Sequence, residues 1–162
     1  MIHLAKAEKK EDVLPILTDK EIFGRISEDG HDLSEFELPF DGTQCYMLIM
    51  IDDLIIGVWC LYPQNKSTMI IHCNILKPYR QHGKEAGRLL VEWFAEECPS
   101  QYFKLNAEIP VIYPDVYHFT KKFGFVDEGV NRASVLKYGK LVDQWRLGLT
   151  RDEARQFMMR VS

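Results

Sequence analysis

The chain has 162 residues, of which 46% are hydrophobic and 27% are charged, and its formal net charge at pH 7 is −4. This length predicts a single domain, residues 1–162, that is large enough to bury a full hydrophobic core. The slightly acidic balance gives no electrostatic support for nucleic acid or an anionic membrane as a partner.

The sequence predicts neither a secretion signal nor a membrane span. The chain becomes charged within its first six residues, so we expect no signal peptide. The longest apolar run, Leu54–Tyr62, is far too short to cross a bilayer. The cysteines, Cys45, Cys60, Cys73 and Cys98, form no CxxC pair and have no spacing typical of metal ligands. We therefore expect buried thiols in a reducing cytoplasm, and no metal site.

The first part of the chain predicts one strand, two short helices and an irregular loop. Apolar periodicity marks the helices, and glycine, proline and several acids mark the loop. Thr18 and Glu21 have the spacing of a capping box that would begin the second helix. The strand, the two helices and the loop are, in that order, Ile2–Ala7, Glu11–Leu17, Lys20–Ile26 and Asp29–Asp41.

The middle of the chain predicts three strands in succession. Gln44–Ile51 and Leu54–Tyr62 are apolar runs on either side of a tight turn at Asp52–Asp53, which is the pattern of an antiparallel hairpin. A third run, Met69–Leu76, follows a second turn. We expect it to be the buried central strand.

A basic segment connects this strand to an amphipathic helix, Lys84–Glu97. The segment contains Lys77, Arg80, Gln81, His82, Gly83 and Lys84. The apolar residues expected on one face of the helix are Ala86, Leu89, Leu90, Trp93, Phe94 and Cys98. A strand that leads through such a segment into a helix directs backbone N–H groups and the positive helix end at one place, which suits a pyrophosphate.

The last part predicts a strand, a helix, a hairpin and a terminal helix. The strand Tyr102–Ile109 follows the amphipathic helix, so we expect it to lie parallel to Met69–Leu76. Gly124 would end the next helix, and Thr150 with Glu153 forms a second capping-box pattern. The remaining elements are the helix Pro114–Phe123, the hairpin strands Phe125–Leu136 and Leu141–Leu149 joined across Tyr138–Lys140, and the helix Thr150–Met159.

The basic segment and its flanking strand and helix resemble the acyl-CoA-binding core of the GCN5-related N-acetyltransferases. In that family the motif Q/R-x-x-G-x-G/A joins a strand to a helix. Here the motif aligns either as Gln81-x-x-Lys84-x-Ala86 or from Arg80, with Gly83 at its first glycine. The order of the predicted elements is also the order of that family.

Further marks of the resemblance lie nearby in the chain. Gly124-Phe125, followed by Glu128-Gly129, is similar to the family's G-F and E-G pairs, and Lys84-Glu85-Ala86 is similar to the helix start of the ribosomal-protein N-terminal acetyltransferase branch. The resemblance implies an acyl-CoA N-acyltransferase fold of the α/β (α+β) class. That fold has a mixed, mostly antiparallel sheet of six to seven strands flanked by helices.

The resemblance also implies acetyl-CoA (coenzyme A) as co-substrate and assigns two groups of residues to it. Backbone N–H groups at Asn74, Ile75 and Leu76 would hold the pantetheine arm and the thioester. The pyrophosphate would bind at the start of the helix, through Arg80, Gln81, His82, Gly83, Lys84, Glu85 and Ala86.

The implied reaction is transfer of acetyl to an amine of a protein N-terminus, a lysine or a small molecule, by direct attack on the thioester. His72 could accept the amine proton, because the unperturbed pKa of histidine lies near neutrality. Alternation places His72 on the strand face of Ile70 and Asn74, opposite Cys73. The alternative is a histidine held by hydrogen bonds between strands.

A proton must also reach the leaving thiolate. Tyr117 could donate it, and Tyr113, His118 or a relay through solvent are alternatives. In many proteins, tyrosines in such a helix pack and form local hydrogen bonds instead.

A second interpretation comes from another class of proteins. The second half of the chain resembles small acetyltransferase-like phage proteins encoded by short-tailed bacteriophages, some of which are described as head-assembly factors. The chain would then be a non-enzymatic interaction protein that keeps the fold. The basic segment favours the enzyme, because a scaffold has no need of an anion site.

The acceptor region is indicated only by charge. Residues 28–41 contain six acids and neither lysine nor arginine. This favours a cationic amine as acceptor, and the alternative is an acidic loop that is simply solvated. The sequence is compatible with a homodimer but does not specify one.

Overall fold

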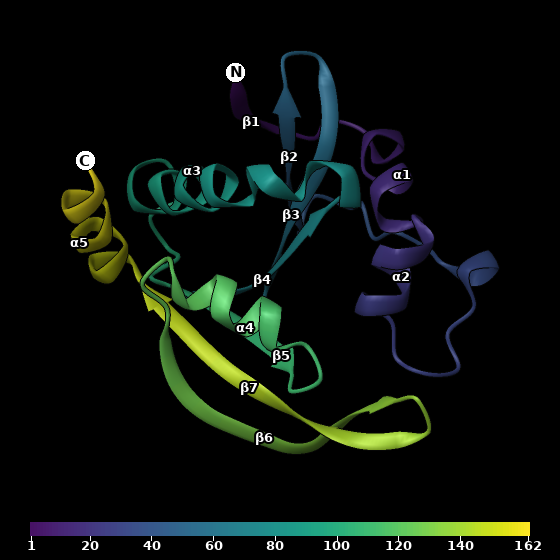
Figure 1. Ribbon diagram of the computed structural model, residues 1–162. Coiled ribbons are helices and arrows are strands. Elements are labelled where there is room, and N and C mark those ends of the chain that lie inside the picture. The colour runs from purple at the N-terminus through teal and green to yellow at the C-terminus, as the bar shows by residue number, and fades with distance from the viewer. The chain divides into compact units, whose positions relative to one another are not determined.

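The computed structural model describes all 162 residues and contains a seven-stranded sheet (Figure 1). The strands are β1 (Ile2–Lys6), β2 (Cys45–Ile51), β3 (Leu54–Pro63), β4 (Thr68–Ile75), β5 (Lys104–Pro110), β6 (Val126–Lys137) and β7 (Lys140–Thr150). Their order in the sheet is β1-β2-β3-β4-β5-β7-β6. β4 and β5 pair in parallel, and the β1–β2, β2–β3, β5–β7 and β6–β7 pairs are antiparallel. The predicted mixed, mostly antiparallel sheet is confirmed.

Five α-helices and three short 3-10 helices lie between or after the strands. They are η1 (Lys10–Asp12), α1 (Leu14–Leu17), α2 (Lys20–Ile26), η2 (Leu33–Glu35), η3 (Lys77–His82), α3 (Gly83–Glu96), α4 (Pro114–Lys121) and α5 (Arg151–Val161). No helix combines the length and the apolar character that a transmembrane span requires.

The chain forms two compact units. The first consists of Met1–Tyr62 and Ile71–Leu90, and the second of Pro63–Ile70 and Val91–Ser162. Both β4 and α3 run from one unit into the other, so each unit contains two separate stretches of chain. The single domain expected from the chain length stays a prediction.

The core of the first unit lies between its short helices and one face of β2 and β3. Ile16 and Leu17 of α1 and Ile22 of α2 pack with Leu48 and Val58 of the strands. These residues are at most 5% exposed. Burial of aliphatic side chains of this size contributes about 1.5–3 kcal/mol each, which explains why helices of only four and seven residues are held in place.

The start of α2 differs from the prediction. Thr18 does not cap the helix, because its hydroxyl donates to the carbonyl of Leu14, one turn back. Asp19 is the N-cap, and its carboxylate accepts from the N–H groups of Glu21 and Ile22. The expected helix Glu11–Leu17 is also divided, into η1 and α1.

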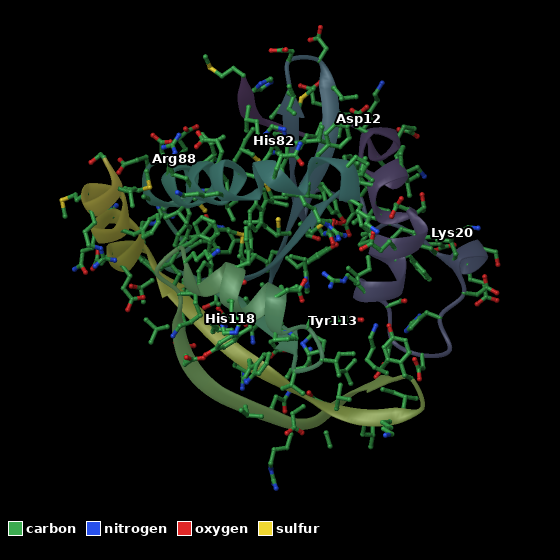
Figure 2. The ribbon with its side chains drawn as sticks, viewed as in Figure 1. Asp12, Lys20, His82, Arg88, Tyr113 and His118 are labelled. Carbon is green, nitrogen blue, oxygen red and sulfur yellow. The ribbon has the colours of Figure 1, made fainter.

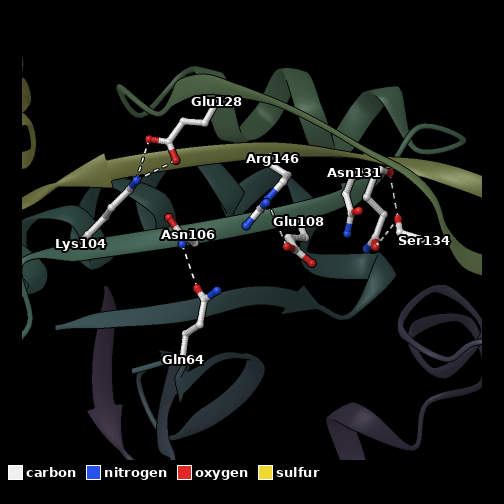
Figure 3. A network of polar contacts seen from close by, with 9 residues as sticks. Gln64, Lys104, Asn106, Glu108, Glu128, Asn131, Ser134 and Arg146 are labelled. Carbon is white, nitrogen blue, oxygen red and sulfur yellow. Dashed lines mark hydrogen bonds and ion pairs between the residues drawn. The ribbon is translucent and has the colours of Figure 1, made fainter. Parts of the chain in front are cut away.

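The second unit places apolar residues on one face of β5 and polar residues on the other. Leu105, Ala107 and Ile109 are buried. On the opposite face (Figure 3), Lys104 Nζ lies 2.7 Å from Glu128, Asn106 donates to Gln64 at 2.9 Å, and Arg146 Nε lies 3.4 Å from Glu108. This alternation is what a strand with one solvated face predicts.

Boundaries in the second unit agree with the sequence only in part. Gly124 has φ 86°, the left-handed conformation that glycine favours, but α4 ends at Lys121 with Lys122 as its C-cap, two residues before the end predicted at Phe123. The Thr150–Glu153 capping box is present at the start of α5. The hairpin turn has only two residues, Tyr138 and Gly139, both with positive φ, so Lys140 is the first residue of β7 rather than part of the turn.

The buried face of α3 is rotated from the one expected. Leu89 and Trp93 are only half-buried, whereas Val91 and Ala95 are buried. Ala86, Leu90, Phe94 and Cys98 are buried as predicted. The chain has four free cysteines: Cys60 and Cys98 are buried, but Cys45 and Cys73 are only half-buried.

We expect Asp19→Ala to lower the free energy of unfolding by about 1 kcal/mol, because it leaves two N–H groups at the start of α2 without their acceptor. Thr18→Ala should cost less, since the Thr18 hydroxyl donates within α1 and does not cap α2. Urea unfolding of both variants measures the difference. A larger loss in Thr18→Ala would show that the cap is assigned to the wrong residue.

Candidate active site

The segment expected to bind the CoA pyrophosphate is a 3-10 helix, η3, that continues directly into α3. The prediction of a loop is therefore wrong, and α3 begins at Gly83 rather than Lys84. The N–H groups of Tyr79 and Gly83 donate to the carbonyl groups of Leu76 and Arg80. These two N–H groups are already bonded within η3. An anion at this place would therefore interact with the positive end of α3 and with side chains.

Arg80 is held in an ion pair with α2. Its Nη2 lies 2.6 Å from Oε1 of Glu21, and both side chains are 40% exposed. An ion pair this exposed contributes about 0–1 kcal/mol, so an incoming pyrophosphate could replace Glu21 at small cost. Sequence analysis missed this neighbour, because no local pattern brings Glu21 and Arg80 together.

The other residues predicted to bind the pyrophosphate lie between Arg80 and the first turns of α3. Figure 2 shows His82 where η3 meets α3, with Arg88 further along the helix. Gln81, Lys84 and Glu85 are exposed, His82 is half-buried, and Gly83 and Ala86 are buried. Glu85 forms an ion pair with Arg88 at 2.9 Å, and the hydrogen bond from Arg88 lowers the pKa of Glu85. Arg88 therefore compensates the carboxylate that stands near the expected anion site.

The end of β4 lies unusually close to the backbone of β3. The Asn74 carbonyl oxygen is 2.5 Å, and the Ile75 Cα 3.0 Å, from the position that a Cβ on Gly57 would occupy. The Asn74 carbonyl therefore points toward β3. Because a peptide unit is planar and trans, the N–H of Ile75 points the opposite way, away from β3.

The other two N–H positions predicted on β4 differ from Ile75. Leu76 donates its N–H to the carbonyl of Ile56 at 2.9 Å, so that group is already engaged with β3. Asn74 is 5% exposed, and its Nδ2 donates to Cys60 Sγ at 3.7 Å. Of the three residues, Ile75 has the geometry that best suits contact with a ligand.

His72 shares a face of β4 with Asn74, as alternation predicts. Its ring packs edge-on against Tyr62, with 6.0 Å between the ring centroids. Tyr62 and Cys60, the partners of His72 and Asn74, are alternate residues of β3. Alternation along β3 could have identified Tyr62 as a site residue, but sequence analysis did not.

His72 is exposed at the surface, yet the surrounding protein displaces water from its ring and disfavours the charged form. This desolvation lowers the pKa of His72. Exposure limits the size of the shift and keeps the ring accessible to a proton. A neutral, accessible imidazole is the form that a general base requires.

The environment of the nearby cysteines disfavours the thiolate form. Burial raises the pKa of Cys60 to about 12 and also raises the pKa of Cys73. Both side chains are therefore neutral thiols at physiological pH, and the thiolate is the reactive form.

Tyr117, the predicted acid, belongs to the second unit, whereas His72, the end of β4 and the basic segment belong to the first. Its hydroxyl donates to Asp127 Oδ2 at 2.8 Å, and Lys121 Nζ lies 2.9 Å from the same oxygen. The hydrogen bond to Asp127 raises the pKa of Tyr117. Tyr117 also packs against Trp145, with ring centroids 4.5 Å apart.

The two alternatives to Tyr117 lie close to it in the chain. Figure 2 shows Tyr113 directly before α4 and His118 on α4. The His118 ring contacts Tyr117 edge-on at 5.2 Å between centroids, and His118 is exposed. The Tyr113 hydroxyl is buried.

Solved structures similar to this chain are acetyltransferases. The spermidine N-acetyltransferase from Vibrio cholerae, in complex with CoA and spermine, matches with TM-score 0.78 and 15% identity, over 95% of this chain and 98% of that chain. A chimera of the Vibrio cholerae enzyme with a second protein, hSSAT, has TM-score 0.77 at 16% identity, over 95% of this chain and 98% of that chain. A candidate acetyltransferase has TM-score 0.75 at 17% identity, over 99% and 88%.

No protein-family model and no curated protein sequence matches the chain. At these identities the likeness establishes the fold. The chain has the acyl-CoA N-acyltransferase fold of the GCN5-related N-acetyltransferases, as its motifs and element order predict.

We expect Glu21→Gln to raise the affinity for CoA by about two- to fivefold, because it frees Arg80 from an exposed ion pair worth about 0–1 kcal/mol. Titration calorimetry at low salt measures the change, which added salt should reduce. Asp152→Asn is the matched control, since it frees Arg155 from an exposed ion pair on α5, outside the predicted CoA-binding residues, and should leave CoA affinity unchanged. Weaker binding by Glu21→Gln would mean that Glu21 orients Arg80 for the ligand.

Proposed function

We propose that this protein is an acetyl-CoA-dependent N-acetyltransferase that transfers acetyl to an amine by direct attack. The observation that carries the proposal is the fold, matched over nearly its whole length to an enzyme solved with CoA and an amine. The connection from β4 through η3 to α3 supports it, because a 14-residue helix begins beside Arg80, His82 and Lys84. Its positive end and these side chains suit a pyrophosphate.

The reaction needs a neutral amine held against the thioester. The amine nitrogen forms a bond to the carbonyl carbon, the carbon–sulfur bond breaks, and CoA leaves as a thiolate. The Ile75 N–H, directed away from β3, would donate to the acyl-CoA arm. A fixed donor of this kind stabilises charge without reorganisation, and holding both reactants in place contributes much of the acceleration.

His72 is the group that we assign to the amine proton, directly or through one water. Its lowered pKa keeps the imidazole neutral at physiological pH. Its exposure allows the accepted proton to leave to solvent. One side of the ring packs edge-on against Tyr62.

The thiolate can be protonated by Tyr117 or by solvent. Tyr117 would first have to give up its hydrogen bond to Asp127, and its raised pKa makes it a weaker acid. Solvent has no such requirement. We therefore propose solvent as the main proton source and keep Tyr117 as the candidate side chain.

A cationic amine is the acceptor class that the charges favour. All six acids of residues 28–41 are exposed. Hydrogen bonds from Ser34 and Thr43 lower the pKa values of Asp32 and Asp41, so both stay ionised at neutral pH. The similar enzyme from Vibrio cholerae was solved with spermine, a polyamine. The alternative of a head-assembly protein receives no support from the structures compared.

CoA should raise the melting temperature of the protein, because a ligand that binds only the native state stabilises it by about 2.7 kcal/mol at 100 times its Kd. Radiolabelled acetyl-CoA should then transfer label to a polyamine faster than to a neutral peptide N-terminus. An unchanged melting curve at millimolar CoA would refute the enzyme. A shift in melting temperature without transfer to any amine would refute acetyl transfer and leave only CoA binding.

His72→Ala should lower turnover by about 10²-fold, as loss of a general base does, with little change in CoA affinity. In the wild type, kcat/KM should fall with decreasing pH at a value below about 6.5, because desolvation lowers the pKa of His72. Repeating the pH profile with an acceptor of different amine pKa separates the titration of His72 from the titration of the amine. Normal turnover in His72→Ala, or an acid limb that follows the amine, would remove His72 from the mechanism.

A further inference from the structure

At Gly57 the backbones of β3 and β4 approach each other too closely to admit a side chain. A Cβ at this position would lie 2.5 Å from the Asn74 carbonyl oxygen and 3.2 Å from Ile75 Cγ1. The first contact is with backbone, so no side-chain rotation could relieve it. A glycine inside a strand often marks such a close backbone approach. The sequence therefore carried a signal at Gly57 that sequence analysis did not use.

A second contact holds the same peptide from the side chain of Asn74. The Asn74 amide is 5% exposed and donates to Cys60 Sγ at 3.7 Å, and Cys60 is 1% exposed. Gly57 and Cys60 both lie on β3. Gly57 therefore leaves room for the Asn74 carbonyl, and Cys60 holds the Asn74 side chain.

We propose that Gly57 and Cys60 are positioning residues for the acyl arm of CoA. Together they fix the plane of the Asn74–Ile75 peptide, and this plane decides where the Ile75 N–H points. The inference rests on the proposed function and deepens it. It states that Gly57 and Cys60, which need not touch the ligand, determine the direction of the Ile75 N–H. Nothing in it depends on the basic segment, which would hold the other end of CoA.

Because the two ends of CoA would be held by different residues, binding of each end can be measured separately. A variant that is only less stable would not weaken binding of one end alone. Adenosine 3′,5′-bisphosphate contains the nucleotide end of CoA without the pantetheine arm. A residue that positions the Ile75 N–H should affect CoA and leave this nucleotide alone. A residue that merely supports the fold should affect both ligands equally.

Gly57→Ala is the first test, because its methyl group must displace the Asn74 carbonyl. We expect about tenfold weaker CoA binding, corresponding to the loss of one hydrogen bond, with less than a twofold change for adenosine 3′,5′-bisphosphate. The KM for acetyl-CoA should rise more than the KM for the amine. Gly24→Ala is the matched control, since a Cβ at Gly24 meets nothing within 4 Å.

Cys60→Ala is the second test and covers the case in which Gly57→Ala fails to fold. It removes the sulfur that holds the Asn74 amide, and we expect CoA binding to weaken about two- to fivefold, as for loss of a weak hydrogen bond, again without effect on the nucleotide. Cys98→Ala, another buried cysteine, lies in the second unit and controls for loss of a core thiol.

The outcomes separate this inference from the proposed function. A wild-type protein that binds neither CoA nor acetyl-CoA would refute the proposed function and the inference with it. A wild type that binds CoA, with variants that lose both ligands equally or neither, would overturn the inference alone. Selective loss of CoA binding in Gly57→Ala or Cys60→Ala, with unchanged controls, is the expected result.

Discussion

The close contact of β3 and β4 at Gly57 is the constraint on which the candidate site depends. This contact fixes the orientation of the Asn74–Ile75 peptide plane. Because the peptide is planar, the direction of the Ile75 N–H is fixed with it. The same two strands carry Tyr62, on β3, and His72, on β4, whose rings are in contact. One backbone approach thus fixes the geometry of the donor, and alternation along β4 places His72, the candidate base, on the same face as Asn74.

Charge at the start of α3 is arranged differently. Here the partners are long, exposed side chains, and their ion pairs are weak enough to exchange. Glu21 holds Arg80, and Arg88 compensates Glu85. A phosphate-bearing ligand could enter such a site by replacing partners, without movement of the backbone. The end of β4 would therefore position a hydrogen-bond donor for the ligand. The exchangeable side chains of η3 and α3 would supply charge for its phosphates.

The sequence predicted most of the fold because its signals are local. The hairpin at Tyr138–Gly139 and the Thr150–Glu153 capping box depend on residues within four positions of each other. The errors arose where two local signals competed. Thr18 and Asp19 are both good caps; the Thr18 hydroxyl donates to Leu14 in α1, and Asp19 caps α2. Likewise, the basic segment has the composition of a loop, yet it forms a 3-10 helix.

What the sequence determined by itself is the order of the elements and the mostly antiparallel sheet. These follow from apolar periodicity and turn residues, which act over a few positions. The tertiary structure alone decided that Glu21 meets Arg80, that Asp127 engages Tyr117, and which β4 N–H points away from β3. Each is a meeting of residues from different elements. Such contacts are set by how the elements pack, and no spacing within the sequence records them.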